Sequence, residues 1–262
     1  TVSVTINELA LLAGSITAQT DVLCNGNATG SFTVTASGAT APYTFNIGAG
    51  DQATGDFTGL AAGSYAVTIT DANGCTFTVS VTINEPAILT ASAGGGQAIC
   101  EGDNATFNGS GAGGTPGYTF LWNFGDGNTS SQATPAHTYG AAGSYSATFT
   151  VTDAQGCEAV DVSTITVNAF PIVNFDATSD VTCSGNCDGT ISVSGGETYQ
   201  WDDPSAQTSA TATNLCVNTY TVVVTDANGC VNTGNATITE PALLAGSITA
   251  QVNVDCNGNA TG

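Results

Sequence analysis

Hydrophobic and β-branched residues alternate with small polar residues along most of this chain. The alternation is clearest in three related stretches, which run from Gly63 to Cys75, from Gly143 to Cys157 and from Asn218 to Cys230. Each stretch has a tyrosine near its start and ends in Asp-Ala-Asn/Gln-Gly-Cys. A period of two predicts a β-strand, and the Asn-Gly or Gln-Gly step supplies a residue that can adopt positive φ in a turn. Three copies of this strand and turn predict repeated modules.

The first of these repeats contains five further strand patterns. We predict strands at Ser15–Gln19, Gly30–Ser37, Tyr43–Gly48, Phe57–Leu60, Ser64–Asp71 and Thr76–Asn84. Clusters of Gly, Asn and Asp separate the strands, and no segment has the period of a helix. Short strands spaced by turn signals predict an all-β sandwich.

The repeats divide most of the chain into three complete modules. We predict them at residues 10–86, 87–169 and 170–241, and we call them the first, second and third modules. Glu85-Pro86 and Glu240-Pro241 mark the ends of the first and third modules. No long Gly/Ser linker separates the modules, which predicts that they abut in a semi-rigid rod.

Both ends of the sequence repeat other parts of it. Residues 1–8 are identical to residues 78–85, so we predict that residues 1–9 are the last strand of a preceding repeat. The first 30 residues recur as the last 30 at a shift of 232, with 22 identical positions, which predicts the start of a further repeat at residues 242–262. We therefore expect a longer parent polypeptide in which a 232-residue unit is repeated in tandem.

The charge composition excludes two classes of function. The chain has 21 acidic residues, one histidine and no lysine or arginine, which gives a formal net charge of −21. Nucleic-acid binding requires cations against phosphate, and amphipathic membrane-surface helices are typically basic, so we expect neither activity. No apolar run is long enough to span a membrane, so we expect no membrane insertion of this segment. The hydrophobic content of 41% argues against intrinsic disorder.

The first and third modules share a set of sequence motifs. In the first module these are Cys24 with its glycine-rich continuation, Pro42-Tyr43, Leu60 to Tyr65, Thr70 to Cys75 and Ile83 to Pro86. In the third module they are Cys183, Gly195-Gly196, Tyr220, Thr225 to Cys230 and Ile238 to Pro241. With these motifs both modules resemble the SprB repeat of gliding-motility adhesins from Bacteroidota. The third module departs from the usual pattern by placing Cys216 shortly before its tyrosine.

The second module carries a different set of motifs. Trp122 to Gly127, His137-Thr-Tyr139 and the stretch from Gly143 to Asp153 resemble a PKD domain, an immunoglobulin-like β-sandwich common on extracellular proteins. Together the two resemblances imply an all-β chain of tandem immunoglobulin-like β-sandwich modules. They further imply an extracellular, cell-surface location and export by the type IX secretion route.

These resemblances predict a structural and adhesive role and no enzymatic activity. The expected function is a repeat segment of a giant adhesin filament that serves gliding motility or surface attachment. The expected partners are neighbouring repeats of the same polypeptide, with surface polysaccharide or other cells as ligands. Two alternatives are a self-assembling filament or surface-layer subunit, and the accessory binding modules of a secreted polysaccharide-degrading enzyme.

The nine cysteines can be sorted by module. One pair brackets each module and a further pair lies inside the third, which predicts the disulfides Cys24–Cys75, Cys100–Cys157, Cys183–Cys230 and Cys187–Cys216. The four cysteines of the third module allow three connectivities, and buried reduced thiols are the alternative for all of them. Metal binding by cysteine is disfavoured because no Cys-x-x-Cys pair occurs. Cys256 is equivalent to Cys24, so we expect it to be unpaired in this sequence.

Acidic and amide side chains in tight turns are candidate calcium ligands. Calcium takes six or more oxygen ligands, but Asp and Asn are also favoured in turns for reasons of backbone geometry. The candidates are Asp71, Asn73, Asp126, Asp153, Asp226 and Asn228. No EF-hand motif is present, and loose screening of the negative charge by divalent cations is the alternative. We expect no other cofactor.

No set of residues with catalytic spacing is present. His137 is the only imidazole, and its Pro-Ala-His-Thr-Tyr context is typical of a structural strand. No Gly-x-Ser-x-Gly elbow occurs that could supply an activated nucleophile. Trp122 and Trp201 lie in predicted strands, which favours a place in the sandwich core over a sugar-binding platform.

Overall fold

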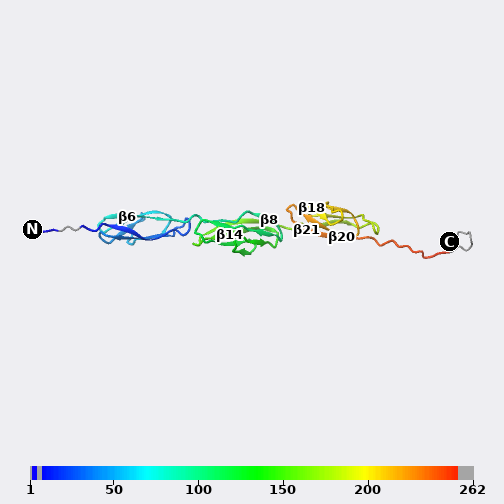
Figure 1. Cartoon of the computed structure of the whole chain (residues 1–262), viewed down its shortest axis with the longest axis horizontal. Helices are drawn as coiled ribbons and strands as arrows, with labels where there is room; N and C mark the ends of the chain where they lie inside the picture. The colour runs from blue at the N-terminus through cyan, green and yellow to red at the C-terminus, as the bar shows by residue number, and fades with distance from the viewer. Residues whose placement is uncertain (1, 5–7, 253–262) are drawn as a thin grey trace. The chain divides into compact units, whose positions relative to one another are not determined.

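All regular elements in the described part of the chain are β-strands. The computed structural model describes residues 2–4 and 8–252, and residues 1, 5–7 and 253–262 are not described. The strands are numbered β1 to β21 in chain order (Figure 1). Within the described residues no helix is long and apolar enough to cross a membrane. The predicted all-β fold class is confirmed.

The first module contains two antiparallel three-stranded sheets. Its strands are β1 (Ala13–Thr20), β2 (Gly30–Ser37), β3 (Thr44–Asn46), β4 (Asp56–Leu60), β5 (Gly63–Thr70) and β6 (Thr76–Ile83). One sheet has the order β1-β2-β4 and the other has the order β3-β5-β6. The six predicted strands are all present, and their ends differ from the prediction by no more than about two residues, a usual uncertainty at strand ends.

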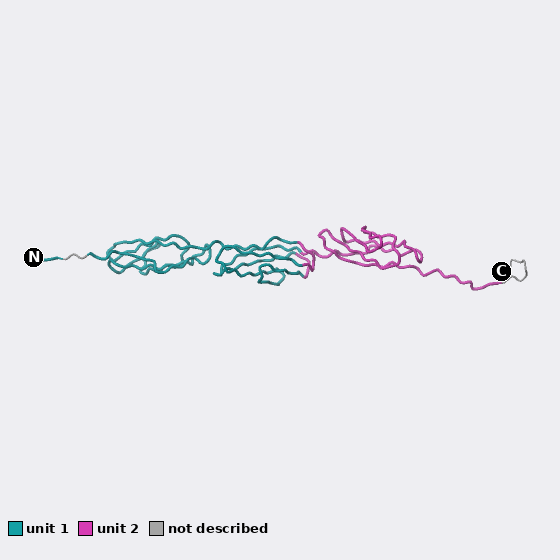
Figure 2. The backbone as a smooth tube through the Cα atoms, viewed as in Figure 1, with its two compact units in different colours: residues 1–97, 104–139, 144–166 teal, residues 98–103, 140–143, 167–262 magenta. Residues whose placement is uncertain are grey.

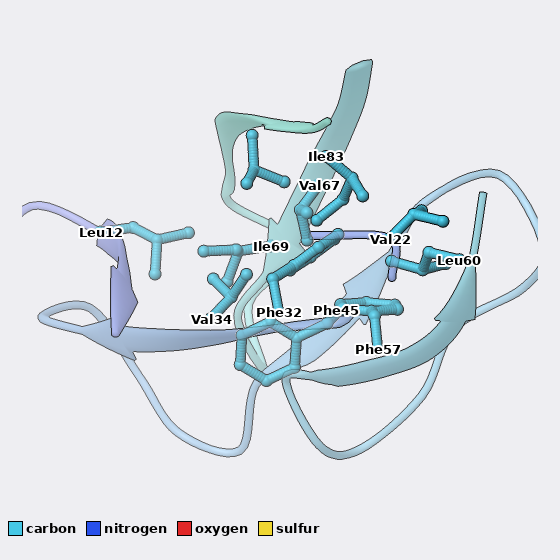
Figure 3. Close-up of a cluster of buried hydrophobic side chains, with 11 residues drawn as sticks. Leu12, Val22, Phe32, Val34, Phe45, Phe57, Leu60, Val67, Ile69 and Ile83 are labelled. Atoms are coloured by element: carbon cyan, nitrogen blue, oxygen red, sulfur yellow. The ribbon is translucent and has the colours of Figure 1, made fainter. Parts of the chain in front are cut away.

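Side chains from both sheets of the first module meet in one apolar core (Figure 3). Phe32 and Phe57 come from one sheet, and their ring centroids are 5.0 Å apart. Val67 and Ile69 come from β5 of the other sheet and are fully buried, while the threonines between and after them are less buried. The period-two pattern in the sequence thus separates core residues from surface residues, as a half-buried strand requires.

The third module repeats this topology. Its strands are β16 (Asn174–Ser179), β17 (Gly189–Ser194), β18 (Thr198–Trp201), β19 (Thr211–Leu215), β20 (Asn218–Thr225) and β21 (Val231–Ile238). Its sheets have the orders β16-β17-β19 and β18-β20-β21, which correspond strand by strand to those of the first module. Trp201, Tyr220 and Val222 belong to its core.

The second module has more strands and a more aromatic core. Its strands are β7 (Thr90–Ser92), β8 (Gln97–Cys100), β9 (Asn104–Thr106), β10 (Ser110–Ala112), β11 (Thr119–Asn123), β12 (Thr129–Ser130), β13 (Ala136–Thr138), β14 (Gly143–Thr152) and β15 (Glu158–Asn168). The main sheet has the order β12-β11-β14-β15-β8. Trp122 lies between Phe107 and Phe149, with centroid distances of 4.7 and 4.6 Å.

Both tryptophans lie in cores. Trp122 is 0% exposed and Trp201 is 2% exposed, and their indole N–H groups donate to the carbonyl oxygens of Ala133 and Ser209. The prediction that they are core residues is confirmed. A sugar-stacking platform requires an accessible ring face, which neither residue offers.

The described chain divides into two compact units (Figure 2). Unit 1 consists of Thr1–Gln97, Asn104–Tyr139 and Ser144–Thr166, and unit 2 consists of Ala98–Asp103, Gly140–Gly143 and Val167–Gly262. The first module lies wholly in unit 1, and the third module lies wholly in unit 2. Cys24 and Cys157 therefore belong to unit 1, and Cys100 and Cys230 belong to unit 2.

The strand expected at the beginning of the sequence is not present in its described residues. Val2 and Val4 lie in no strand and are 95% and 79% exposed. The identical residues Val79 and Val81 lie in β6, where they pair with β5 immediately before them. Residues 1 and 5–7 of the expected strand are outside the described residues.

Candidate functional site at the module ends

Cys24 lies at the end of the first module where the chain leaves it, which we call the trailing end. It lies in the loop between β1 and β2, and hydrogen bonds hold this loop against the segment that follows β6. The Val22 N–H donates to the Asn84 carbonyl at 2.9 Å, and the Gly26 N–H donates to a carboxylate oxygen of Glu85 at 2.7 Å.

Cys75 lies at the opposite end, where the chain enters the module, which we call the leading end. It closes the turn between β5 and β6, and the Ala72 N–H of this turn donates to the Thr40 carbonyl at 3.0 Å. The neighbouring Ala39 N–H donates to the carbonyl of Ala10, at the start of the module. The turn thus lies beside the incoming chain.

The predicted Cys24–Cys75 disulfide is therefore wrong. An eight-residue strand such as β6 is about 26 Å long and separates the two ends of the sandwich. Two cysteines whose Cα atoms are more than about 7 Å apart cannot form a disulfide without moving the backbone. The same geometry applies to the predicted pairs Cys100–Cys157 and Cys183–Cys230.

The structure instead joins cysteines of different modules. Cys24 bonds to Cys157 with a Cα–Cα distance of 5.7 Å, and Cys100 bonds to Cys230 with a Cα–Cα distance of 5.5 Å. In each bond a trailing-end cysteine is joined to the turn cysteine of the module that follows. We call each such bond a joint.

The remaining cysteines differ in their pairing. Cys187 bonds to Cys216 inside the third module, which is the extra pair that the sequence predicts. Cys75 and Cys183 are free and exposed, because their predicted partners are used in the joints. Cys256 is outside the described residues.

The sequence contained a signal for the joints. Cys24 comes one strand after the start of its module, and Cys75 comes one strand before the end of its module. A strand crosses the sandwich from one end to the other, so these positions must lie at opposite ends. A pairing based on module membership alone does not take this strand direction into account.

Each joint includes a turn that is organised by an aspartate. In the second module, one carboxylate oxygen of Asp153 accepts the N–H groups of Gln155 and Cys157, both at 2.9 Å. The other oxygen accepts the Thr115 N–H at 2.8 Å. This last hydrogen bond is the main reason why the pKa of Asp153 is lowered, and the Cys157 and Gln155 N–H groups lower it further against the opposing effect of burial.

The turn of the first module has the same arrangement. One oxygen of Asp71 accepts the N–H groups of Asn73 and Cys75 at 2.9 and 2.7 Å, and the other accepts the Thr40 N–H at 3.2 Å. Burial alone would raise the pKa of Asp71, but hydrogen bonds from Cys75, Thr40 and Asn73 outweigh it, and the pKa is lowered. Asp226 in the third module accepts the N–H groups of Asn228 and Cys230.

The glycine of each turn has the backbone conformation that the sequence predicts. Gly74, Gly156 and Gly229 have φ angles of 83°, 82° and 83°. A residue with a Cβ atom rarely adopts this left-handed region, so glycine is the favoured residue before each cysteine.

These carboxylates are occupied by backbone groups. The calcium candidates Asp71, Asp153 and Asp226 lie in separate modules, and each accepts hydrogen bonds from its own turn. Among the described residues no group of three or more His, Cys, Asp and Glu side chains is placed to hold a metal ion. Calcium binding therefore stays a prediction, and the turn hydrogen bonds give the aspartates a structural role without it.

Asp126, the remaining acidic candidate, pairs with the only histidine. Its carboxylate lies 2.7 Å from Nε2 of His137, and it also accepts the Asn128 N–H at 3.0 Å. Burial opposes ionisation of Asp126, but the hydrogen bonds from Asn128 and His137 outweigh it and the pKa is lowered. The imidazole is stacked on Phe124 at a centroid distance of 4.1 Å.

Tyr139 completes this cluster. It is fully buried, its hydroxyl donates to the Phe124 carbonyl at 3.1 Å, and burial raises its pKa to about 12. The tyrosine is thus a neutral core residue at physiological pH. His137 lies in β13, Tyr139 directly follows this strand and Asp126 lies in the loop between β11 and β12, so the cluster holds β13 against that loop.

Two segments of the chain match known protein families. Residues 87–167 match the PKD domain, and residues 16–52 match the SprB repeat. These segments correspond to most of the second module and to the first half of the first module.

Similar curated proteins include two collagenases and a metalloprotease, which match over a short segment. The collagenase ColA of Bacillus cereus is 45% identical over 53 residues, and a microbial collagenase of Vibrio alginolyticus is 46% identical over 50 residues. The pre-pro-metalloprotease PrtV of Vibrio cholerae is 48% identical over 56 residues. These matches cover 19–20% of this chain, and the chain spans only 6% of the length of each relative.

Two similar solved structures have low sequence identity to this chain. A tandem of titin domains covers 87% of this chain and 100% of its own, with a TM-score of 0.40 and 14% identity. A fragment of a 1.5-MDa bacterial ice-binding adhesin covers 88% of this chain and 98% of its own, with a TM-score of 0.39 and 15% identity. The strands of this chain form tandem β-sandwich modules of the immunoglobulin-like class, in which residues 16–52 match the SprB repeat and residues 87–167 match the PKD domain.

Proposed function

We propose that this chain is a load-bearing repeat segment of an extracellular, cell-surface adhesin. The observation that carries the proposal is the pair of joints, Cys24–Cys157 and Cys100–Cys230. Disulfides persist in oxidising, extracellular surroundings. A bond between consecutive modules adds little to either core, but it limits how far a pulled chain can extend.

The joints shorten the covalent path through the chain. With the disulfides intact, the shortest path runs from residue 1 to Cys24, from Cys157 to Cys187 and from Cys216 to residue 262. It includes about 99 of about 261 residue steps. At an extended length of about 3.4 Å per residue, the chain reaches roughly 340 Å when oxidised and roughly 900 Å when reduced.

Two further features support an exposed, structural role. The matches to an SprB repeat and a PKD domain support the proposal that the chain serves in a gliding or attachment adhesin. The absence of lysine and arginine from the sequence leaves no cleavage site for trypsin-like proteases. The expected ligands are surface polysaccharide or other cells.

Stretching single molecules tests the load-bearing role. We expect the oxidised chain to reach a final contour of roughly 340 Å, and the Cys24→Ser/Cys157→Ser chain to reach roughly 450 Å because the path then runs through Cys100–Cys230. Opening both joints leaves only Cys187–Cys216 and predicts roughly 790 Å. Equal contours for the wild type and the four-serine chain would refute the load-bearing role.

The protease matches favour a second candidate function. The 50–56 residues shared with collagenases and a metalloprotease are consistent with accessory modules of a secreted degradative enzyme. Co-sedimentation of the chain with insoluble collagen and with insoluble polysaccharides distinguishes the two. Retention on collagen supports the accessory function, whereas attachment of chain-coated beads to intact cells without collagen binding supports the adhesin.

A further inference from the structure

The two free cysteines occupy positions where the other modules carry a bonded cysteine. Cys75 lies in the leading-end turn of the first module, and Cys183 lies in the trailing-end loop of the third module. Both thiols are exposed. Each is therefore one half of a joint whose other half is not supplied by the described residues.

The backbone around Cys75 matches that of the bonded turn cysteines. The N–H of the turn aspartate donates to the cysteine carbonyl at 3.0 Å for Cys75, 2.9 Å for Cys157 and 3.0 Å for Cys230. The cysteine N–H donates back to the aspartate carboxylate at 2.7, 2.9 and 2.8 Å. Cys75 is thus presented in the conformation that forms a joint in both following modules.

The loop around Cys183 matches that of the bonded Cys24. The Gly185 N–H donates to a carboxylate oxygen of Glu240 at 2.9 Å, as Gly26 does to Glu85 at 2.7 Å. The loop before the cysteine is also held in the same way, because the Val181 N–H donates to the Thr239 carbonyl at the module exit. Cys183 is therefore held beside the outgoing chain.

The sequence after Cys183 identifies the module that follows. Residues 242–251 repeat residues 10–19 without a change, so the outgoing chain begins a copy of the first module. The turn cysteine of such a copy is the equivalent of Cys75. Shifted by the 232-residue period, it lies about 124 residues after Cys183, close to the separations of 133 and 130 in the two joints.

Apolar side chains accompany both free thiols. Cys75 lines a cavity of about 430 Å³ with Leu9, Leu12 and Phe77, and Cys183 lines a cavity of about 310 Å³ with Leu243. At the Cys24–Cys157 joint the corresponding surfaces lie together. There both cysteines line one cavity of about 410 Å³ with Asn25, Ile88 and Leu89.

We propose that Cys183 of one 232-residue unit forms a disulfide with Cys75 of the next unit. The occupant of each free end is thus a second copy of this chain in the same polypeptide. The bond forms as two thiols lose two protons and two electrons, and a disulfide oxidant such as glutathione disulfide is reduced to two thiols. Every module boundary then carries a joint. The inference stands on the cysteine geometry and does not depend on the adhesive role.

A tandem chain tests this bond. Residues 1–241 are followed directly by residues 10–262, which reproduces the natural period. Serine replaces Cys75 of the first copy and Cys183 and Cys256 of the second. The first-copy Cys183 and the second-copy Cys75 are then the two cysteines that have no partner within their own copy. The protein is folded in a glutathione redox buffer, alkylated without reduction and digested with a protease that cleaves after Asp and Glu.

We expect a cross-linked species in which residues 181–188 are joined through Cys183 to the peptide that contains the second-copy Cys75, and through Cys187 to the peptide that contains Cys216. Alkylation of Cys75 and Cys183 in the folded tandem, with the Cys24–Cys157 and Cys100–Cys230 bonds intact, would overturn the proposal. Replacing the first-copy Cys183 with serine is the matched control, and it should convert the second-copy Cys75 from unlabelled to fully labelled. This peptide analysis is independent of the stretching and adhesion experiments, so failure of the proposed function and failure of this bond are distinguishable.

Discussion

Aspartate side chains stabilise several turns of this chain, and the sequence contains no lysine or arginine with which they could form salt bridges. With no lysine or arginine, carboxylates find their partners in backbone N–H groups. Asp153 accepts three of them, and Asp203 accepts those of Ser205 and Gln207. Hydrogen bonds to a charged acceptor favour the ionised form. The turns therefore depend on charge although salt bridges to Lys or Arg are absent from the sequence.

This arrangement predicts that the fold is sensitive to acid. The aspartates with lowered pKa values are Asp21, Asp71, Asp126, Asp153, Asp161, Asp180, Asp188 and Asp203. A carboxylate with a lowered folded pKa contributes its stability above the unfolded pKa of about 3.9 and loses it as the pH falls through the folded value. We expect the thermal midpoint to fall steeply below about pH 4, as measured by circular dichroism at constant ionic strength.

The Asp153→Asn variant provides the control for this pH dependence. Its amide oxygen still accepts hydrogen bonds but cannot titrate. We expect a lower midpoint than the wild type at pH 7 and a smaller loss of midpoint between pH 5 and pH 2. A wild-type midpoint that is unchanged over this range would contradict the titration mechanism.

At the scale of strands and loops, identical peptides have different structures in this chain. Leu12 of the sequence ALLAGSITAQ is 4% exposed beside the strand that begins at Ala13, whereas Leu244 of the same sequence is 96% exposed. The first copy pairs with β2, and the second has no described strand beside it. A single strand cannot bury its apolar face alone, so its structure depends on a partner.

The Cys187–Cys216 disulfide is predicted to stabilise the third module alone. It closes a loop with a sequence separation of 29 residues, and the chain-entropy relation gives about 3–4 kcal/mol for a loop of this length. We expect the Cys187→Ser/Cys216→Ser variant to lower the unfolding free energy of the third module by this amount. In a Trp122→Phe background, fluorescence of the buried Trp201 reports on that module in denaturant titrations.

The matched control for this variant opens a joint instead. The Cys24→Ser/Cys157→Ser chain leaves every residue of the third module unchanged, so the Trp201 transition should not move. A shift of equal size in both variants would show that the loss is not specific to the Cys187–Cys216 loop.

At the scale of the whole molecule, the net charge of −21 is not balanced by any cation in the sequence. Mutual repulsion of carboxylates destabilises a compact state, and salt screens it over a Debye length that falls from about 30 Å at 0.01 M to about 8 Å at 0.15 M. The fold is therefore stabilised by its apolar cores, its backbone ladders and its disulfides against an unfavourable electrostatic term.

Salt is thus predicted to raise the thermal midpoint by a few degrees over this range. Calcium chloride and magnesium chloride at equal ionic strength should raise it equally, because the turn carboxylates already accept backbone hydrogen bonds. Melting curves in the two salts and in chelator provide the measurement. A larger effect of calcium would reveal a specific site and would contradict simple screening.

Most of the fold could be predicted because its causes are local. Alternation of apolar and polar residues located the six strands of the first module, and Asp-x-x-Gly-Cys located the turns. The position of Trp122 and Trp201 in strands predicts that they are core residues, and both are buried. The Cys187–Cys216 pair is also predictable, because both cysteines belong to one module.

Local sequence is sufficient to specify the strands, the turns and the modular repeat, because period-two patterning and turn chemistry act over a few neighbouring residues. Which cysteines meet depends instead on how the strands are arranged in three dimensions. Cys24 and Cys75 belong to one module, yet a strand of about 26 Å separates them, while Cys157 lies 133 residues away and within bonding distance. The two copies of ALLAGSITAQ likewise differ in burial because only the first copy has a described partner strand beside it.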